Sequence, residues 1–293
     1  MALKIIKSSE PIRVERINVC IYGQPGAGKT SLAFTSDSPL LLDFDNGSYR
    51  AANRKDSVKI DSWSDISQMT KEDLEPYKTI VVDTAGRALD LLTLDILRRD
   101  PKAGNNGALG IKGFGVLKSE FIAWLKQLNS FGKDVVLIAH MDEQKKGDDI
   151  IERLDVQGGS KGEIYKSSDA MGRIYIKGKG RALNFSPSDT AFGKNPGQLD
   201  VLEFSHPTQS TRFLADVIQS IKDNLNQMTE EQVKAQQNLE EWRAKIEAFS
   251  TIEDFNGSLE EVKRQPVSVR SILAEAAKAK SYNFDKETAR FTA

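Results

Sequence analysis

Short apolar runs alternate with amphipathic segments between residues 14 and about 205. Nearly pure apolar runs are typical of strands buried on both faces of a parallel sheet, and they are found at 16–22, 39–43, 78–83 and 135–139. Apolar residues at spacings of three and four predict helices at 87–98 and 115–131. Two later strands, 173–177 and 182–186, flank the glycine-rich turn 178–180. This pattern predicts an α/β fold with a mainly parallel sheet and a late antiparallel edge.

The chain changes character after residue 213, where Ala, Glu, Gln and Lys dominate. Thr229 with Gln232, and Ser250 with Glu253, have the spacing of helix capping boxes, and residues 267–280 continue the helical pattern. Two polar, glycine-bearing segments, 100–115 and 145–162, are predicted to be long loops. We therefore expect a core domain at 1–212 and a helical C-terminal region at 213–293.

Composition narrows the classes of function. The 293 residues include 41 Lys and Arg against 42 Asp and Glu, so any site for a polyanion must be local. The single cysteine, Cys20, excludes an intramolecular disulfide framework and a multi-cysteine metal cluster. Its apolar runs are shorter than a bilayer span, and charged residues interrupt the N-terminus too early for a signal peptide. We expect no membrane association and a cytoplasmic location.

A phosphate-binding loop follows the first predicted strand. Residues 23–30, GQPGAGKT, match G-x-x-x-x-G-K-[ST] in full, and a short helical stretch follows. Such a loop directs backbone N–H groups at a β-phosphate, while its Lys reaches the β and γ oxygens and its hydroxyl ligates Mg²⁺. Here these are Lys29 and Thr30. The residues predicted to contact the nucleotide are Gly23, Gln24, Pro25, Gly26, Ala27, Gly28, Lys29, Thr30 and Ser31.

A second ligand for Mg²⁺, in the outer sphere, is expected at the end of the strand 78–83, where Asp83 completes the Walker B pattern. The alternative for Asp83 is a structural one, capping the helix that begins near Gly86. Asp83-Thr84-Ala85-Gly86 also matches the D-x-x-G motif of GTPases. However, Ala139 and His140 stand where a guanine-reading Asn and Lys would be, and only Asp142 of that motif remains. The sequence therefore favours ATP, with a divergent GTPase as an alternative.

Residues 40–47, LLLDFDNG, form an apolar strand that ends in two alternate acids. This resembles RecA-type ATPases, in which a carboxylate just past this strand polarises the attacking water, and Asp45 occupies that position, although the RecA pattern carries Glu. The other interpretation of Asp45 is an Asx turn. The resemblance also implies that His140, after the strand 135–139, senses the γ-phosphate, where RecA-type proteins usually carry Gln. A capping or core-edge histidine is the alternative for His140.

As an ordered set, the motifs at 23–31, 40–48, 79–85, 138–142 and 171–173 make residues 17 to about 187 similar to phage-encoded P-loop proteins with a RecA-like core. Among these are the single-strand-annealing ATPases of phage recombination. The resemblance implies a DNA-stimulated ATPase that binds or anneals single-stranded DNA beside a single-strand-binding protein, in the cytoplasm of a bacterial host. The expected cofactors are ATP and Mg²⁺.

A local basic window supplies the candidate DNA surface. Residues 157–181 contain six basic and two acidic residues, a net charge of +4. An aromatic side chain among cations suits the stacking of unpaired bases. The candidate DNA contacts are Arg173, Tyr175, Lys177, Lys179 and Arg181. The alternatives are a solvated hairpin tip, or a cation (Lys177, Lys179 or Arg181) that reaches the ATP of a neighbouring subunit.

The pattern identifies no arginine that completes the site within one chain, so we expect a head-to-tail ring or filament. The C-terminal region is a poor candidate for the DNA surface, because residues 222–264 contain ten acids and six bases. A second function therefore stays open: a nucleotide-dependent switch or scaffold with weak ATPase activity, acting on a protein partner through its helical tail.

Overall fold

The computed structural model describes residues 6–7, 10–147, 149–156, 160–206 and 209–293. It has two compact units, residues 14–225 and residues 1–13 together with 226–293, and the division falls within helix α6 (Phe213–Glu247). The domain division at 212/213 stays a prediction. The compact units differ from it because Leu214, Ile218 and Ile221 of α6 pack into the core of the larger unit.

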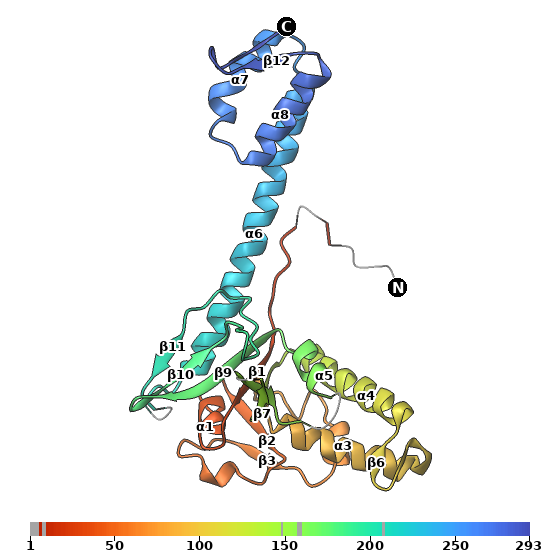
Figure 1. Ribbon diagram of the computed structural model, residues 1–293. Helices are drawn as coiled ribbons and strands as arrows, with labels where there is room; N and C mark the ends of the chain where they lie inside the picture. The colour runs from red at the N-terminus through yellow and green to blue at the C-terminus, as the bar shows by residue number, and fades with distance from the viewer. Residues whose placement is uncertain (1–5, 8–9, 148, 157–159, 207–208) are drawn as a thin grey trace. The chain divides into compact units, whose positions relative to one another are not determined.

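A nine-stranded sheet forms the centre of the larger unit (Figure 1). Its strands are β1 (Asn18–Gly23), β2 (Pro39–Asp43), β3 (Ser57–Lys59), β4 (Thr79–Asp83), β7 (Asp134–Lys146), β8 (Asp149–Leu154), β9 (Ala170–Lys177), β10 (Gly180–Asn184) and β11 (Leu202–Phe204). The order is β11-β10-β9-β1-β7-β4-β2-β3, with β8 paired to β7. All neighbours from β3 to β9 are parallel, whereas β10, β11 and β8 pair antiparallel.

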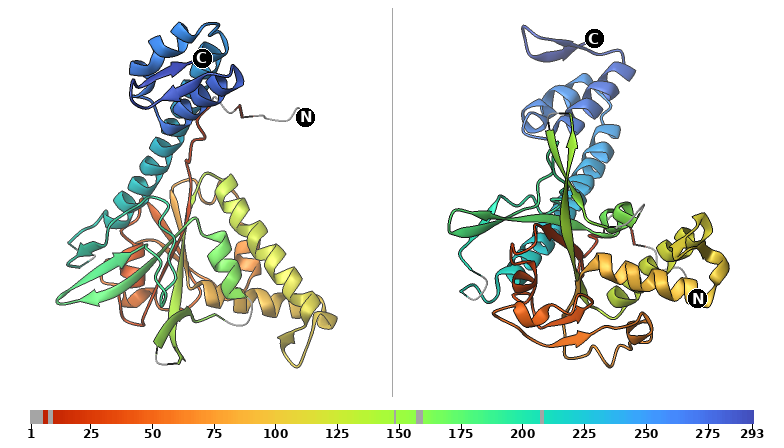
Figure 2. Two further views of the ribbon diagram at one scale, coloured as in Figure 1. Left: turned by 45° about the horizontal axis from the view of Figure 1, so that its top comes forward. Right: turned by 60° about the horizontal axis from the view of Figure 1, so that its bottom comes forward.

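Helices cover both faces of this sheet (Figure 2). They are α1 (Lys29–Ala33), α2 (Ser64–Ser67), α3 (Ala85–Arg99), α4 (Ile111–Ser130) and α5 (Ser160–Ser167), with the start of α6. Along β1, Cys20 and Tyr22 join the core beneath α3 and α4, while Val19 and Ile21 join the core beneath α1 and α6. Since both faces are buried, the central strands are apolar at almost every position.

The two segments predicted to be long loops contain regular structure. Residues 101–109 form η2 (Pro101–Ala103) and a small hairpin of β5 (Gly104–Asn105) and β6 (Ala108–Leu109), and α4 begins at Ile111. Strand β7 continues past its predicted end and pairs with β8, whose Ile151 and Leu154 are buried. The loop predictions were therefore wrong in these parts. Strand pairing and the burial of a few apolar side chains give regular structure to sequences that are mainly polar. Residues 157–159 lie outside the described residues.

The smaller unit is mainly helical. Its elements after α6 are α7 (Ile252–Val262), α8 (Val267–Ala279), β12 (Asn283–Asp285) and β13 (Arg290–Thr292). They pack around a core that includes Trp242, Phe255 and Phe291. A capping box starts α7, formed by Thr251 with Asp254, one residue later than predicted.

One predicted helix start was wrong. Thr229 lies inside α6, where its hydroxyl donates to the carbonyl oxygen of Asn226. The helix starts sixteen residues earlier because its first turns pack on the sheet, a tertiary contact that outweighs the local capping pattern.

The predicted α/β architecture is confirmed: a core with a mainly parallel sheet and an antiparallel edge, followed by a helical C-terminal region. The RecA-like character of the core stays a prediction. In the described part of the chain, no helix combines the length and apolar character needed to cross a bilayer.

Candidate functional site

The phosphate loop has the predicted strand-to-helix setting. Strand β1 ends at Gly23, and α1 begins at Lys29. Gly26 and Gly28 adopt φ values of 79° and 94°, in the left-handed region that favours glycine. These glycines let the backbone turn sharply just before α1. The backbone N–H groups of the loop then lie at the N-terminus of this helix, an arrangement that suits the binding of phosphate.

Lys29 is a buried cation at the base of this loop. Its Nζ donates hydrogen bonds to the carbonyl oxygens of Gly23 (2.8 Å) and Gln24 (3.0 Å). Burial lowers the pKa of Lys29 to about 8, although the charges of Asp83 and Asp45 act in the opposite direction. A polyanionic ligand would favour the charged ammonium further.

Thr30 and Asp83, the pair predicted to bind the metal, are hydrogen-bonded to each other. Thr30 Oγ1 donates to Asp83 Oδ2 at 2.7 Å, and burial raises the pKa of Asp83 to about 6. Thr84 is the N-cap of α3, since its side chain accepts a hydrogen bond from the backbone N–H of Arg87, so Asp83 is not the helix cap. A hydroxyl and a carboxylate are hard oxygen donors and fit Mg²⁺.

The two acids after β2 have separate environments. Asp43 is buried, and its two carboxylate oxygens accept hydrogen bonds from the backbone N–H groups of Gly47 and Ser48, both at 3.0 Å. Asp43 therefore makes the turn that had been the alternative for Asp45. The carboxylate of Asp45 instead lies 3.3 Å from Arg87 Nε and 3.4 Å from His140 Nε2.

The phosphate loop, Asp45, Asp83 and His140 line one cleft with a volume of about 560 Å³. Its lining residues are Pro25, Gly26, Gly28, Lys29, Thr30, Ser31, Asp45, Gly47, Arg50, Ala51, Ala52, Asp83, His140, Arg181 and His206. Parallel pairing explains the convergence: Asp83 is in register with Asp43 on β2, and Gly23 is in register with His140 on β7. The carboxyl ends of parallel strands thus bring their side chains to one edge of the sheet.

Arg87 and Arg50 were missed by the sequence analysis. Arg87 contacts Asp45 from the first turn of α3, and Arg50 lines the cleft from η1 (Ser48–Arg50). Neither residue belongs to a motif. The only sequence signal for either is its position shortly after the end of a predicted strand. A further contact joins Gln24 of the loop to Glu143 of β7, with Nε2 donating to Oε1 at 2.6 Å.

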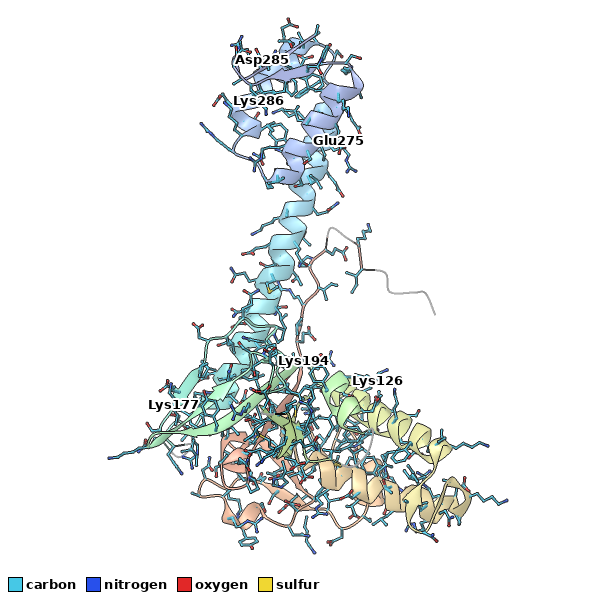
Figure 3. All side chains as sticks on the ribbon, in the orientation of Figure 1. Lys126, Lys177, Lys194, Glu275, Asp285 and Lys286 are labelled. Carbon is cyan, nitrogen blue, oxygen red and sulfur yellow. The ribbon has the colours of Figure 1, made fainter. Side chains whose placement is uncertain are left out.

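The five candidate DNA contacts have different surroundings in the structure. Arg173 forms an ion pair with Glu152 of β8 and lies over the ring of Tyr175, 4.9 Å from its centroid. Lys177, which Figure 3 shows at the end of the β9–β10 hairpin, pairs with Glu203 of β11 at 2.5 Å. The positive charge counted along residues 157–181 is therefore partly offset by acids from neighbouring strands.

The other two candidate cations differ from these. Arg181 reaches the phosphate loop of its own chain, where its Nε donates to the carbonyl oxygen of Ala27 at 2.8 Å. Lys179, in the turn between β9 and β10, forms no ion pair with any described residue. The five residues therefore do not make a single unpaired cationic surface.

The guanine-reading position of a GTPase is not formed in this region. Asp142 lies within β7, opposite Arg153 of β8, rather than at the end of a strand. Ala139 is fully buried.

Comparison with known proteins places the cleft within a recognised family. Residues 15–196 match a protein family described as AAA domain. No curated protein matches the chain. Among solved structures, one described as an ATPase domain is similar, with 10% sequence identity, a TM-score of 0.38, and coverage of 67% of this chain and 84% of that chain.

Proposed function

The chain belongs to the AAA domain family, whose match covers residues 15–196, and from this membership we propose that its cleft binds Mg²⁺-ATP and hydrolyses it. One observation carries the proposal. Lys29, the hydrogen-bonded pair of Thr30 and Asp83, and the carboxylate of Asp45 all face the same cleft. These are the parts that phosphoryl transfer to water requires: a phosphate cradle, oxygen ligands for Mg²⁺ and a group that orients the water.

The loop residues bind and orient the triphosphate. Backbone N–H groups of the loop, with Lys29, hold the phosphates, and Thr30 and Asp83 are the residues that would hold Mg²⁺. The metal, when bound, supplies positive charge that neutralises the phosphate oxygens. Thr30 Oγ1 donates a hydrogen bond to Asp83 Oδ2, and this contact holds the two oxygen ligands next to each other.

Asp45 polarises the attacking water. Its carboxylate lies in the cleft, whereas the backbone N–H groups of the adjacent turn donate to Asp43. Arg87 and His140 hold the two oxygens of Asp45 from different elements, and this fixes its orientation. His140 also lines the cleft, so it can report the state of the phosphates to β7.

Single-stranded DNA is the proposed macromolecular partner, with DNA stimulating hydrolysis during annealing. Support comes from one hairpin, which carries the exposed Lys177, the Arg173–Tyr175 stack and Lys179, a lysine without an ion-pair partner among the described residues. A single-strand-binding protein and assembly into a ring or filament remain part of this proposal. The competing function is a switch or scaffold with weak ATPase activity. In that case the smaller helical unit would bind the protein partner.

Multiple-turnover ATPase assays with and without single-stranded DNA test these functions together. We expect phosphate release that depends on Mg²⁺ and rises when DNA is added. ATP binding with negligible turnover and no response to DNA would favour the switch or scaffold. Turnover of GTP in preference to ATP would favour the divergent GTPase.

A further inference from the structure

Strand β10 carries Arg181 into the wall of the cleft of its own chain. Its Nε donates to the carbonyl oxygen of Ala27 at 2.8 Å, and its terminal Nη1 lies 3.5 Å from the carbonyl oxygen of Ser205. Ala27 belongs to the phosphate loop and precedes Arg181 by 154 residues. A guanidinium has five N–H donors, so these two carbonyls fix its position and leave donors for a ligand.

The guanidinium also packs directly on the loop backbone. A Cβ atom added at Gly28 would lie 2.9 Å from Arg181 Nε and 3.6 Å from the central carbon of the guanidinium. No side chain separates the two, and Gly28 is the residue immediately before Lys29. Arg181 and the phosphate loop therefore form one continuous surface of the cleft.

The charge of Arg181 is available to an anion. Among the residues that the structure describes, no carboxylate lies within ion-pair distance of Arg181, in contrast to Arg173 and Lys177 on the same hairpin. The carbonyl groups of Ala27 and Ser205 orient the guanidinium without neutralising it. Guanidinium groups bind phosphate oxygens with charge-assisted, often paired hydrogen bonds.

We infer that Arg181 binds the phosphates of the nucleotide held by its own chain. The inference rests on the proposed ATP site and specifies that Arg181 acts in cis. It separates Arg181 from the hairpin cations Lys177 and Lys179, which contact no phosphate-loop atom among the described residues.

Equilibrium binding of Mg²⁺-ATP tests the inference. Arg181→Ala should weaken ATP binding about tenfold to a hundredfold, because a hydrogen-bonded charged contact is lost. Arg181→Lys keeps the charge and the aliphatic stem and should recover part of the affinity. Lys126→Ala, at an exposed position of α4, should bind as the wild type does. Circular dichroism and thermal unfolding establish that each variant is folded.

A mixing experiment separates cis from trans action. Lys29→Ala chains lack the loop lysine and Arg181→Ala chains lack the guanidinium, so no chain in the mixture has both. If Arg181 acts in cis, the ATPase rate of the mixture equals the average of the two variants measured alone. A rate well above that average would overturn the inference, because it requires Arg181 from one chain to serve another.

The inference and the proposed function fail in different ways. Wild-type ATP affinity in Arg181→Ala would overturn the inference alone. If the wild type itself bound no ATP, the proposed function and the inference would both fall. Should Arg181→Ala not fold, Arg181→Lys carries the same comparison, and ATP affinity equal to that of the wild type would count against the inference.

Discussion

The nucleotide cleft and the β9–β10 hairpin both contain charged residues that the sequence singles out, but folding treats the two sets differently. In the cleft, Lys29, Asp45 and Asp83 come from separate segments and face one volume. On the hairpin, Arg173 and Lys177 are close in sequence but turn to different acids, Glu152 and Glu203.

The difference follows from sheet geometry. Residues at the carboxyl ends of parallel strands lie at one edge of the sheet, whatever their separation along the chain. Motifs at the ends of different strands therefore come close together in the folded protein. Residues along one strand meet the side chains of whichever strands pair with it. Net charge counted in a sequence window is therefore a poor guide to the charge of the folded surface.

The largest expected effect is on the cleft. Lys29→Ala should weaken Mg²⁺-ATP binding by at least about a hundredfold, because it removes the buried cation that the phosphate loop holds through two hydrogen bonds. Titration calorimetry measures the affinity, and Lys179→Ala on the hairpin is the matched control. Wild-type affinity in a folded Lys29→Ala variant would refute the nucleotide site.

The next effect separates two acids within the cleft region. Asp45→Asn should retain ATP and reduce hydrolysis about a hundredfold, since an amide is a poor base for the water. Asp43→Asn is the matched change two residues earlier. It should lower the free energy of unfolding by about 1–3 kcal/mol, because it disturbs the acceptors of the Gly47 and Ser48 N–H groups. Equal turnover in Asp45→Asn and the wild type would assign Asp45 no catalytic role.

A smaller effect tests the pairing of the hairpin cations. Glu152→Gln should lower the free energy of unfolding by about 1–3 kcal/mol, because Glu152 is buried and its loss leaves Arg173 without its acid. Glu203→Gln removes the partner of an exposed lysine and should have no measurable effect on unfolding. Urea denaturation compares the two. Similar losses for both variants would contradict the distinction between a buried and an exposed pair.

The smallest effect concerns DNA. The double change Lys177→Ala with Lys179→Ala should flatten the salt dependence of single-stranded DNA binding, by about 1.4 in the slope of log affinity against log salt if each lysine neutralises one phosphate. Fluorescence anisotropy over a salt series measures the slope. Lys126→Ala, on α4, is the control (Figure 3). An unchanged slope would remove the hairpin tip from the DNA surface.

Much of the cleft could be predicted because its residues belong to short motifs at strand ends. The bounds of β2 match the predicted strand, and Asp45, Asp83 and His140 all lie beside the phosphate loop. What each does there stays a prediction. Their convergence needs only the parallel order of the strands, which alternating apolar runs already indicate.

The remainder depends on tertiary contacts that no local pattern encodes. Arg181 was predicted to contact DNA or the ATP of a neighbouring subunit. It contacts Ala27 of its own chain, 154 residues earlier, because β9 pairs with β1 and places β10 near the loop. Glu152, the acid that pairs with Arg173, lies on β8, within a segment whose polar and glycine residues predicted a loop.

A single-turnover experiment tests the central claim most directly. Wild-type protein in excess over γ-labelled ATP is quenched at successive times, with Mg²⁺ or with a chelator. We predict that the bound ATP is converted to ADP and phosphate with Mg²⁺, and that Asp45→Asn binds the same ATP but converts it about a hundredfold more slowly. Recovery of intact ATP from the Mg²⁺-loaded wild type would contradict the account.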